Sequence, residues 1–354
     1  MSIRTDEKTE LRTRVLTSPR LGPELRRDME EIDARSSLAH PFQTEPYAML
    51  FNTDRTRSPY IVVAEDAKGL AAHWWGYFSR YREGLVPRSN AWARSGPVVR
   101  EDLRDRRDEF FGPMLATLKR HVRQQRVGWI IFTSEALYGA DCGEACRTQG
   151  FERHGLQTYL LDLMPSEEEM SKSLDQRARW SANKARKNGV SVGDAAADDD
   201  VRAYYRIYLE TASFPGSNPP PEDVFLRGFN RLRDEKKARL VVAKHDGEVV
   251  AGSFFPCHAG FAAQNQHAVS AEARRLNAGS LLIWESMLSF KEAGFHTLDL
   301  VSVDVDPPEG SREAGVREFK SRFGGVLIDT PVYVYRSPAL RAWRQLMGRL
   351  RSRR

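Results

Sequence analysis

Residues 240–255 read LVVAKHDGEVVAGSFF, and this stretch decides the fold. Apolar residues lie on both sides of Asp246-Gly247, and an Asp-Gly pair between two apolar runs is a strong short-range signal for a β-hairpin. Residues 60–78, YIVVAEDAKGLAAHWWGYF, repeat the pattern around a turn at residues 66–69. We therefore expect two β-hairpins of the same kind, one in each half of the chain.

Each expected hairpin is followed by a helix and then by a short apolar strand. In the first half, a helical stripe that includes Val122 precedes a strand at residues 129–132. In the second half, a helix that ends at Gly294 precedes a strand at residues 297–300. A short helix, a glycine turn and a last strand complete each half, and these last strands are expected at residues 156–161 and 326–335.

The two copies lie about 170 to 180 residues apart, which makes them domain-sized units. We therefore predict an α/β fold, a tandem of two domains with mixed central sheets flanked by helices. The predicted divisions are a lead-in, two domains and a basic C-terminal helix, at residues 1–30, 31–164, 165–335 and 336–354. The central boundary rests on a capping box formed by Ser166 and Glu169, which starts a new helix. The alternative is that any two α/β halves look alike at this level of detail.

The composition is that of a globular chain with a basic balance. The 354 residues include 54 Lys and Arg against 48 Asp and Glu, which gives a net charge of +6. A basic balance favours anionic partners such as nucleic acid, nucleotides or phospholipid surfaces, although many basic chains bind nothing acidic. No apolar run approaches the roughly 18 residues of a membrane-spanning helix, and residues 1–10 lack the apolar centre of a secretory signal. We therefore expect a cytoplasmic chain without a transmembrane segment.

The most informative helix is predicted over residues 167–188, EEEMSKSLDQRARWSANKARKN. Its apolar residues recur at helical spacing on one stripe, at Met170, Leu174, Ala178, Ala182 and Ala185. Its other faces carry cations and one indole: Arg177, Arg179, Trp180, Lys184, Arg186 and Lys187. Such a surface suits phosphate binding with a base stacked on the indole, and the alternative is a solvated basic face.

A lysine near a glycine turn is the second candidate. Phe319 and Phe323 are four residues apart, which places both on the core face of a helix, and Lys320 points to a neighbouring face. A fixed lysine provides positive charge for a developing oxyanion or a phosphate. Counting back by a repeat offset of 174 residues reaches Cys146, so the cation belongs to the second copy alone.

Two other basic segments give weaker signals. Arg275 begins RLNAGS, a helix start whose backbone N–H groups suit an anion, but Ala278 stands where an acetyl-CoA pyrophosphate loop has glycine. Residues 336–354 carry seven arginines and an apolar stripe. This tail suits RNA or a membrane surface, and the alternative is a surface helix docked by its stripe.

Several common catalytic motifs are absent from the sequence. We find no G-x-x-x-x-G-K-[ST], no G-x-G-x-x-G after a strand, no H-E-x-x-H and no G-x-S-x-G. The three cysteines and eight histidines do not have zinc-ligand spacing. We therefore expect no metal and no cofactor, and chemistry that depends on positioning and electrostatics.

A set of short motifs, most specific in the last hundred residues, completes the pattern. They are HPFQT at 40–44, GPVV at 96–99, the basic helix at 177–187, LLIWE at 281–285, AG at 293–294, LDL at 298–300 and FKSRFGG at 319–325. By these motifs, residues 36–336 resemble the Fem-type (FemABX) aminoacyltransferases and their relatives among the GNAT-superfamily acyltransferases.

The resemblance implies two GNAT-like domains and transfer of an amino acid from aminoacyl-tRNA to an acceptor amine. The amine, on a small molecule or a peptidoglycan precursor, attacks the ester carbonyl directly and forms an amide bond without an acyl-enzyme. By the same resemblance, Lys320 stabilises the tetrahedral oxyanion or the ribose leaving group, and Phe319 shapes the pocket beside it.

The chain also departs from the Fem pattern. The family commonly has an acidic residue after the Gly-Pro-Val-x segment, where this chain has Arg100, so Glu101 is our substitute candidate for the acid/base role. Residues 213–215, SFP, stand where members that use nucleotide-linked muropeptides have a basic residue, and no long helical arm is inserted. Both departures favour a soluble small-molecule amine.

Three hypotheses follow for the activity. The first is the tRNA-dependent aminoacyltransferase that the resemblance implies. The second is an acyl-CoA-dependent N-acyltransferase of the same fold. The third is a non-catalytic protein that binds RNA or a membrane surface through the basic helix and tail.

Overall fold

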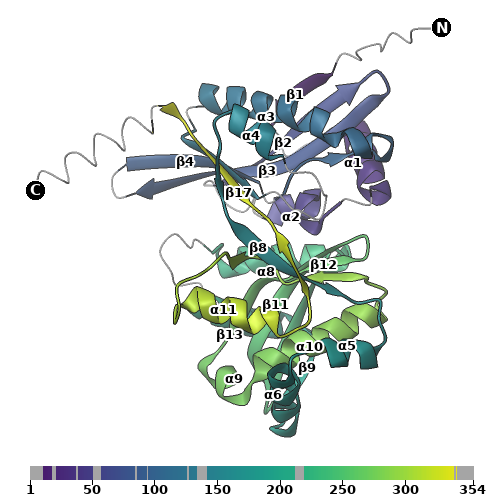
Figure 1. The fold of residues 1–354 in the computed structure, drawn as a ribbon, viewed down its shortest axis with the longest axis vertical. Coiled ribbons are helices and arrows are strands. Elements are labelled where there is room, and N and C mark those ends of the chain that lie inside the picture. Colours follow the sequence, from purple (N-terminus) through teal and green to yellow (C-terminus); the bar gives the residue numbers. More distant parts are fainter. Residues whose placement is uncertain are drawn as a thin grey trace, which may run out of the picture. The chain divides into compact units, whose positions relative to one another are not determined.

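The computed structural model describes the chain at residues 11–17, 21–36, 39–50, 57–83, 86–93, 95–125, 127–133, 142–211, 219–338 and 340. The chain divides into two compact units. Unit 1 comprises Met1–Ala39, Gln43–His154 and Pro331–Arg354, and unit 2 comprises His40–Phe42 and Gly155–Thr330. Each unit is built on a mixed β-sheet flanked by helices (Figure 1). The predicted α/β fold with two mixed sheets is therefore confirmed.

The sheet of unit 1 runs in the order β1-β2-β3-β4-β6-β17-β7, with β5 paired to β3. Its strands are β1 (Arg12–Leu16), β2 (Arg57–Asp66), β3 (Gly69–Glu83), β4 (Val86–Ala93), β5 (Val98–Val99), β6 (Trp129–Thr133), β7 (Glu152–His154) and β17 (Val332–Arg336). Its helices are α1 (Pro23–Arg35), α2 (Glu45–Leu50), η2 (Glu101–Arg106), α3 (Arg107–Gln124) and α4 (Gly143–Thr148), and the short η1 (Pro41–Gln43) contains residues of both units.

The sheet of unit 2 runs in the order β15-β8-β14-β12-β11-β10-β9, with β13 paired to β11 and β16 to β8. Its strands are β8 (Leu156–Asp162), β9 (Ser191–Asp194), β10 (Ala238–His245), β11 (Glu248–His258), β12 (Phe261–Ala263), β13 (Asn265–Val269), β14 (Thr297–Asp299), β15 (Val303–Asp304) and β16 (Val326–Asp329). Its helices are α5 (Glu167–Ser173), α6 (Gln176–Lys187), α7 (Asp198–Thr211), α8 (Glu222–Asp234), α9 (Ala271–Leu276), α10 (Ala278–Glu292) and α11 (Arg312–Ser321).

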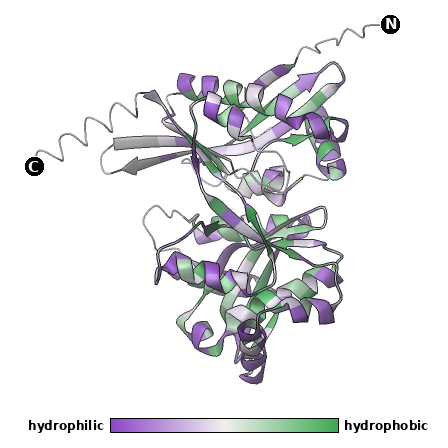
Figure 2. Cartoon of the chain, viewed as in Figure 1, coloured by the Kyte–Doolittle hydropathy of each residue, from purple (hydrophilic) through white to green (hydrophobic). Residues whose placement is uncertain are grey.

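Alternation along the strands separates the two faces of each sheet. In β2, Val62 packs in the core that includes α3, and Val63 packs in the core that includes α1. In β11, Phe255 packs against Phe290 of α10, whereas Phe254 contacts Phe225 of α8 on the other face. Successive strand residues point to opposite faces, so each of these apolar strands contributes side chains to the hydrophobic cores on both faces of its sheet. Figure 2 shows hydrophilic and hydrophobic segments alternating along the helices, as expected of helices with one buried face.

The two halves share a parallel crossover, as the repeated pattern predicts. The hairpins β2–β3 and β10–β11 form as expected. In unit 1, β4 pairs parallel to β6 after a crossover that contains α3. In unit 2, β12 pairs parallel to β14 after a crossover that contains α10. This correspondence of elements supports the interpretation of the chain as a duplicated α/β unit.

The last strands differ from the predicted arrangement. Residues 156–162 form β8 in the sheet of unit 2, not of unit 1. Residues 326–335 split at Pro331: β16 pairs with β8 in unit 2, whereas β17 pairs with β6 and β7 in unit 1. Pro331 has no N–H to give to a ladder, so one continuous strand is broken there. The division of the structure therefore differs from the predicted boundaries at residues 164/165 and 335/336.

The ends of the chain also differ from the sequence prediction. The predicted lead-in at residues 1–30 contains β1, which pairs antiparallel with β2, and the first two turns of α1. Alternating arginines at Arg12 and Arg14 keep one face of β1 polar, as suits an edge strand. Apart from residues 336–338 and 340, the predicted basic helix at residues 336–354 lies outside the described residues.

The predicted helix over residues 167–188 is two helices, α5 and α6. The capping box of Ser166 and Glu169 starts α5 as predicted. Leu174 then takes an extended conformation, and Asp175 caps α6 by accepting a hydrogen bond from the Arg177 N–H at 2.7 Å. The apolar stripe nevertheless stays buried, because both helices pack on the same core. The prediction missed the second cap because the stripe keeps its helical spacing across the break.

Gly324 lies at a turn where the backbone leaves no room for a side chain. Its φ is +76°, and a Cβ at this position would lie 2.7 Å from the backbone oxygen of Ser173 at the end of α5. Gly324→Ala is therefore expected to lower the free energy of unfolding by about 2–4 kcal/mol. Chemical denaturation measures this change. Gly315→Ala is the control, because a Cβ at Gly315 of α11 meets nothing within 4 Å and is expected to be neutral or stabilising; equal effects of the two variants would contradict the prediction.

Candidate functional site

Lys320 lies near the end of α11 and is held by backbone carbonyls. Ser311 caps the start of this helix, so its register is fixed from its first turn. The Lys320 side chain is half-buried, and its Nζ donates hydrogen bonds to the carbonyl oxygens of Val301, at 2.5 Å, and Ser302, at 3.3 Å. The ammonium group therefore sits at a fixed place, just beyond the end of β14.

The sheet of unit 2 opens near this ammonium group. β12 pairs with β14 from Phe261 to Ala263, and the Gln264 N–H still donates to the Asp299 carbonyl at 2.7 Å. Beyond this point β13 pairs with β11. The pairing between β14 and β12 thus ends just before Val301 and Ser302, whose carbonyls bind Lys320.

Phe319 lies against a histidine that the sequence analysis did not single out. The ring of His267, on β13, stacks on the Phe319 ring with centroids 6.0 Å apart and an interplanar angle of 22°. The other side of Phe319 meets Phe323 edge-on at 5.2 Å, which confirms the predicted shared face. Gly279 at the start of α10 adjoins both rings, since a Cβ there would be 3.7 Å from His267 Nε2 and from Phe319 Cζ.

His267 belongs to a small polar network and is neutral at pH 7. Its Nδ1 lies 2.6 Å from the Ser253 hydroxyl and 3.3 Å from the Gln264 amide nitrogen, which also donates to Ser253. Burial, and then the charge of Lys320, lowers the pKa of His267 to about 4. Because the amide donates to Ser253, the Ser253 hydroxyl can donate to Nδ1, which leaves the proton on Nε2.

The cations predicted on the basic helix lie on α6 in unit 2 with Lys320, but several are engaged within the fold. Arg179 donates to the carbonyls of Ser171 and Lys172, and Arg186 pairs with Glu285 at 2.6 Å. These two arginines therefore hold α5 and α10 to α6. Arg177, Lys184 and Lys187 are exposed, and Arg177 is 3.4 Å from the exposed Glu318.

Trp180 stands out on this helix because it is 58% exposed. The Lys184 Nζ lies 4.7 Å from the centre of its ring, in a cation–π contact that orients the indole. Arg275, on α9, is exposed as well. The predicted anion-binding residues are thus distributed over α6 and α9. Arg177, Lys184 and Lys187, the exposed α6 cations other than the Glu285-bound Arg186, form with Trp180 what we call the α6 basic face.

Glu101 is exposed on η2 in unit 1, with a carboxylate oxygen 3.8 Å from Arg104. It helps to line a cavity of about 400 Å³ together with residues of α1 and of the β2–β3 turn. The predicted pairing of Glu101 with Lys320 in one site joins residues of different units, and it stays a prediction.

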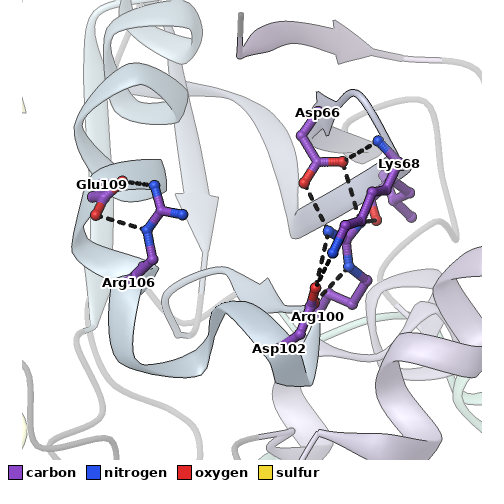
Figure 3. A network of polar contacts seen from close by, with 7 residues as sticks. Asp66, Lys68, Arg100, Asp102, Arg106 and Glu109 are labelled. Carbon is purple, nitrogen blue, oxygen red and sulfur yellow. Dashed lines mark hydrogen bonds and ion pairs between the residues drawn. The ribbon is translucent and has the colours of Figure 1, made fainter. Parts of the chain in front are cut away.

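Arg100, which replaces the expected acidic residue, is a structural clamp. It binds Asp66 and Asp102, each at 2.7 Å (Figure 3). It also donates to the Leu70 carbonyl at 2.9 Å. Burial raises the pKa of Asp66, but the hydrogen bonds from Arg100 and from the Lys68 backbone outweigh it, and the pKa lies below its usual range. The hydrogen bond from Arg100 likewise lowers the pKa of Asp102.

These lowered pKa values predict a pH-dependent effect of the clamp. The stabilisation is present above the unfolded carboxyl pKa of about 4 and is lost as pH falls through the folded values. Arg100→Ala is therefore expected to lower stability by about 2 kcal/mol at pH 7, with the difference shrinking below pH 4. Urea unfolding at both pH values measures this. The exposed Arg106–Glu109 pair of Figure 3 is the control, because Arg106→Ala should lower the free energy of unfolding by less than about 1 kcal/mol. If both variants lose the same free energy of unfolding at pH 7, Arg100 is not a clamp.

The described residues contain neither a membrane-spanning helix nor a metal-binding cluster. No described helix is long and apolar enough to cross a membrane. Within the described ranges, no group of three or more His, Cys, Asp or Glu side chains is placed to hold a metal ion.

Comparison with known proteins identifies the fold. Residues 172–320 match the acetyltransferase (GNAT) domain family. No curated protein matches the sequence. Among solved structures, FemX matches with a TM-score of 0.69 and 14% identity, over 91% of this chain and 98% of that chain. L-PGS from Bacillus licheniformis matches at 0.54 and 15%, over 94% and 97%, and a tandem GNAT protein from the clavulanic acid biosynthesis pathway at 0.55 and 14%, over 92% and 98%. The chain thus has the tandem GNAT fold that its sequence predicts.

Proposed function

We propose that this chain, whose residues 172–320 match the GNAT domain family, transfers an amino acid from aminoacyl-tRNA to an acceptor amine and forms an amide bond. The observation that carries the proposal is the ammonium group of Lys320, fixed by two carbonyls beside Phe319 and the neutral His267. The Phe319-Lys320 pair also lies in the last hundred residues or so, where the resemblance to Fem-type transferases is most specific.

The proposed reaction has one acyl-transfer step. The acceptor nitrogen attacks the ester carbonyl, the carbonyl oxygen becomes an oxyanion, and the C–O bond to the ribose then breaks. The amine loses one proton and the ribose oxygen gains one, so no oxidant and no acyl-enzyme is required. Lys320 supplies positive charge to the oxyanion or to the leaving oxygen. Alignment of two bound substrates contributes on the order of 7–11 kcal/mol.

The α6 basic face is the proposed binding surface for the tRNA. Its exposed cations suit phosphate groups, and the oriented, 58% exposed indole of Trp180 suits an unpaired base. We include Arg275 in this surface, because it lies exposed on α9, just before α10. Glu101 remains our candidate for proton transfer in unit 1. The acceptor is a small-molecule amine or a cell-wall precursor.

The second candidate is an acyl-CoA donor, which the GNAT family match favours. Thermal unfolding separates the two donors, because a ligand at 100 times its Kd stabilises the native state by about 2.7 kcal/mol. The proposal predicts that aminoacyl-tRNA raises the Tm and that acetyl-CoA and free CoA leave it unchanged. If CoA raises the Tm and aminoacyl-tRNA does not, the donor is acyl-CoA and not aminoacyl-tRNA.

A further inference from the structure

Val301 adopts a backbone conformation that β-branched residues rarely take. It lies between β14 and β15, and its φ is +52°. A β-branched residue in this left-handed region is strained, because its Cβ crowds the neighbouring backbone carbonyl. Such strain persists only where surrounding contacts fix the backbone, and strained residues are more frequent at functional sites.

A buried carboxylate two residues earlier provides the contact that fixes Val301. Asp299 is 2% exposed. Its Oδ1 accepts a hydrogen bond from the Val301 N–H at 2.7 Å and another from the Thr158 hydroxyl. An Asp side chain that binds the N–H two residues later forms an Asx turn, which stabilises a non-extended backbone. The Asp299 carboxylate therefore holds the Val301 peptide in its strained conformation.

The strained peptide in turn holds Lys320. The Val301 carbonyl accepts the shorter of the two Lys320 hydrogen bonds, 2.5 Å against 3.3 Å for Ser302. If Val301 returned to an extended conformation, its carbonyl would turn away from α11. The position of the ammonium group thus depends on the backbone conformation of one residue.

The HPFQT motif reaches the same carboxylate from the other half of the sequence. His40 is fully buried, and its Nε2 lies 3.6 Å from Asp299 Oδ2. Its ring packs between those of Phe42 and Phe261, at centroid distances of 4.7 and 4.8 Å. Residues 40–42 belong to unit 2 although the residues around them belong to unit 1. This motif therefore supports the side of Asp299 that faces away from Val301.

We propose that Asp299 is a positioning residue for Lys320, which acts by holding Val301 in its left-handed conformation, with His40 packed behind the carboxylate. This inference rests on the proposed function for its effect on rate. Its effect on the Lys320 side chain requires no activity and can be measured separately.

Two substitutions at residue 301 test the proposal at one position. Val301→Gly keeps the N–H and permits positive φ, whereas Val301→Pro removes the N–H and fixes φ near −65°. We expect Val301→Pro to lower kcat at least tenfold with the donor KM within twofold of wild type. We expect Val301→Gly to stay within about threefold in kcat.

Amine labelling followed by mass spectrometry reads the position of Lys320 without any substrate. Lys291 is a matched internal reference, because its Nζ is also held by two carbonyls, those of Leu163 at 3.0 Å and Met164 at 3.1 Å. Val301→Pro is expected to raise the labelling rate of Lys320 at least fivefold relative to Lys291. Val301→Gly is expected to change it by less than twofold.

Asp299→Ala decides the matter if Val301→Pro does not fold, because alanine removes the oxygen that accepts from the Val301 N–H, whereas asparagine would keep it. It is expected to raise relative labelling of Lys320 at least threefold and, where transfer is measured, to lower kcat at least fivefold. Asp329→Ala is the control, because Asp329 is exposed on β16 and accepts a hydrogen bond from Gln157 at 2.8 Å.

Unchanged Lys320 labelling in folded Asp299→Ala would overturn the positioning role. Absence of transfer by the wild-type chain would contradict the proposed function instead, and the labelling result would still stand.

Discussion

Lys320→Ala is expected to lower kcat about 10²–10³-fold and to change the donor KM little. This magnitude is typical for removal of one preorganised donor to an oxyanion. Lys320 donates to two backbone carbonyls, which hold its positive charge at a fixed place. Single-turnover quench measurements with saturating donor give the rate of the transfer step.

The control for this prediction is Lys291→Ala. It removes a lysine that has the same kind of carbonyl contacts but lies in the last turn of α10. Its transfer rate should equal that of the wild type. Lys320→Arg keeps the charge but changes the donor geometry, and we expect an intermediate rate. Equal single-turnover rates for Lys320→Ala and the wild type, with equal Tm, would remove Lys320 from the mechanism.

Removal of the three exposed cations of the α6 basic face is the second large effect that we expect. The triple alanine variant at Arg177, Lys184 and Lys187 should weaken binding of aminoacyl-tRNA about 10–100-fold at low salt, because each cation neutralises a phosphate. Its slope of log Kd against log salt should fall by about 2–3. Filter binding over a range of salt concentrations measures both quantities.

A charge-matched variant controls for the loss of net charge. Alanine at the exposed Arg227, Arg231 and Lys236, on α8 and just after it, removes the same charge from another surface of unit 2. Its binding should fall less than threefold. If the two triple variants bind equally, the α6 basic face does not contact the tRNA. Trp180→Ala on its own is expected to weaken binding with no change in the salt slope, because stacking is not ionic.

The regular features of the fold were predictable from local sequence. The Asp-Gly turn and the alternating strands gave both hairpins, and helical spacing placed the stripe of α5 and α6 in the core. The exchange of β8 and β17 was not predictable, because periodicity identifies a strand but not its partner. Pro331 marks the break, and only tertiary pairing shows that the two sides of that break join different sheets.

The site shows the same limit. Lys320 and Phe319 were identified because a local motif carries them. Asp299 stands in the quoted LDL motif, but its role and those of His267 and Val301 were missed, because these roles depend on contacts between β13, β14 and α11 that no local pattern encodes. A lone histidine or an aspartate at a strand end gives no signal by itself. Arg100 shows the reverse case, since a departure from the Fem pattern proves to be a clamp within unit 1.

The most direct measurement is transfer of a labelled amino acid from total charged tRNA to amines in a metabolite extract, with the product identified by mass spectrometry. We predict an amide product that disappears when the tRNA is digested with RNase beforehand and that Lys320→Ala forms at least 100-fold more slowly. Binding of tRNA without any product would support the non-catalytic alternative. A product that resists RNase treatment and requires acetyl-CoA would contradict the account.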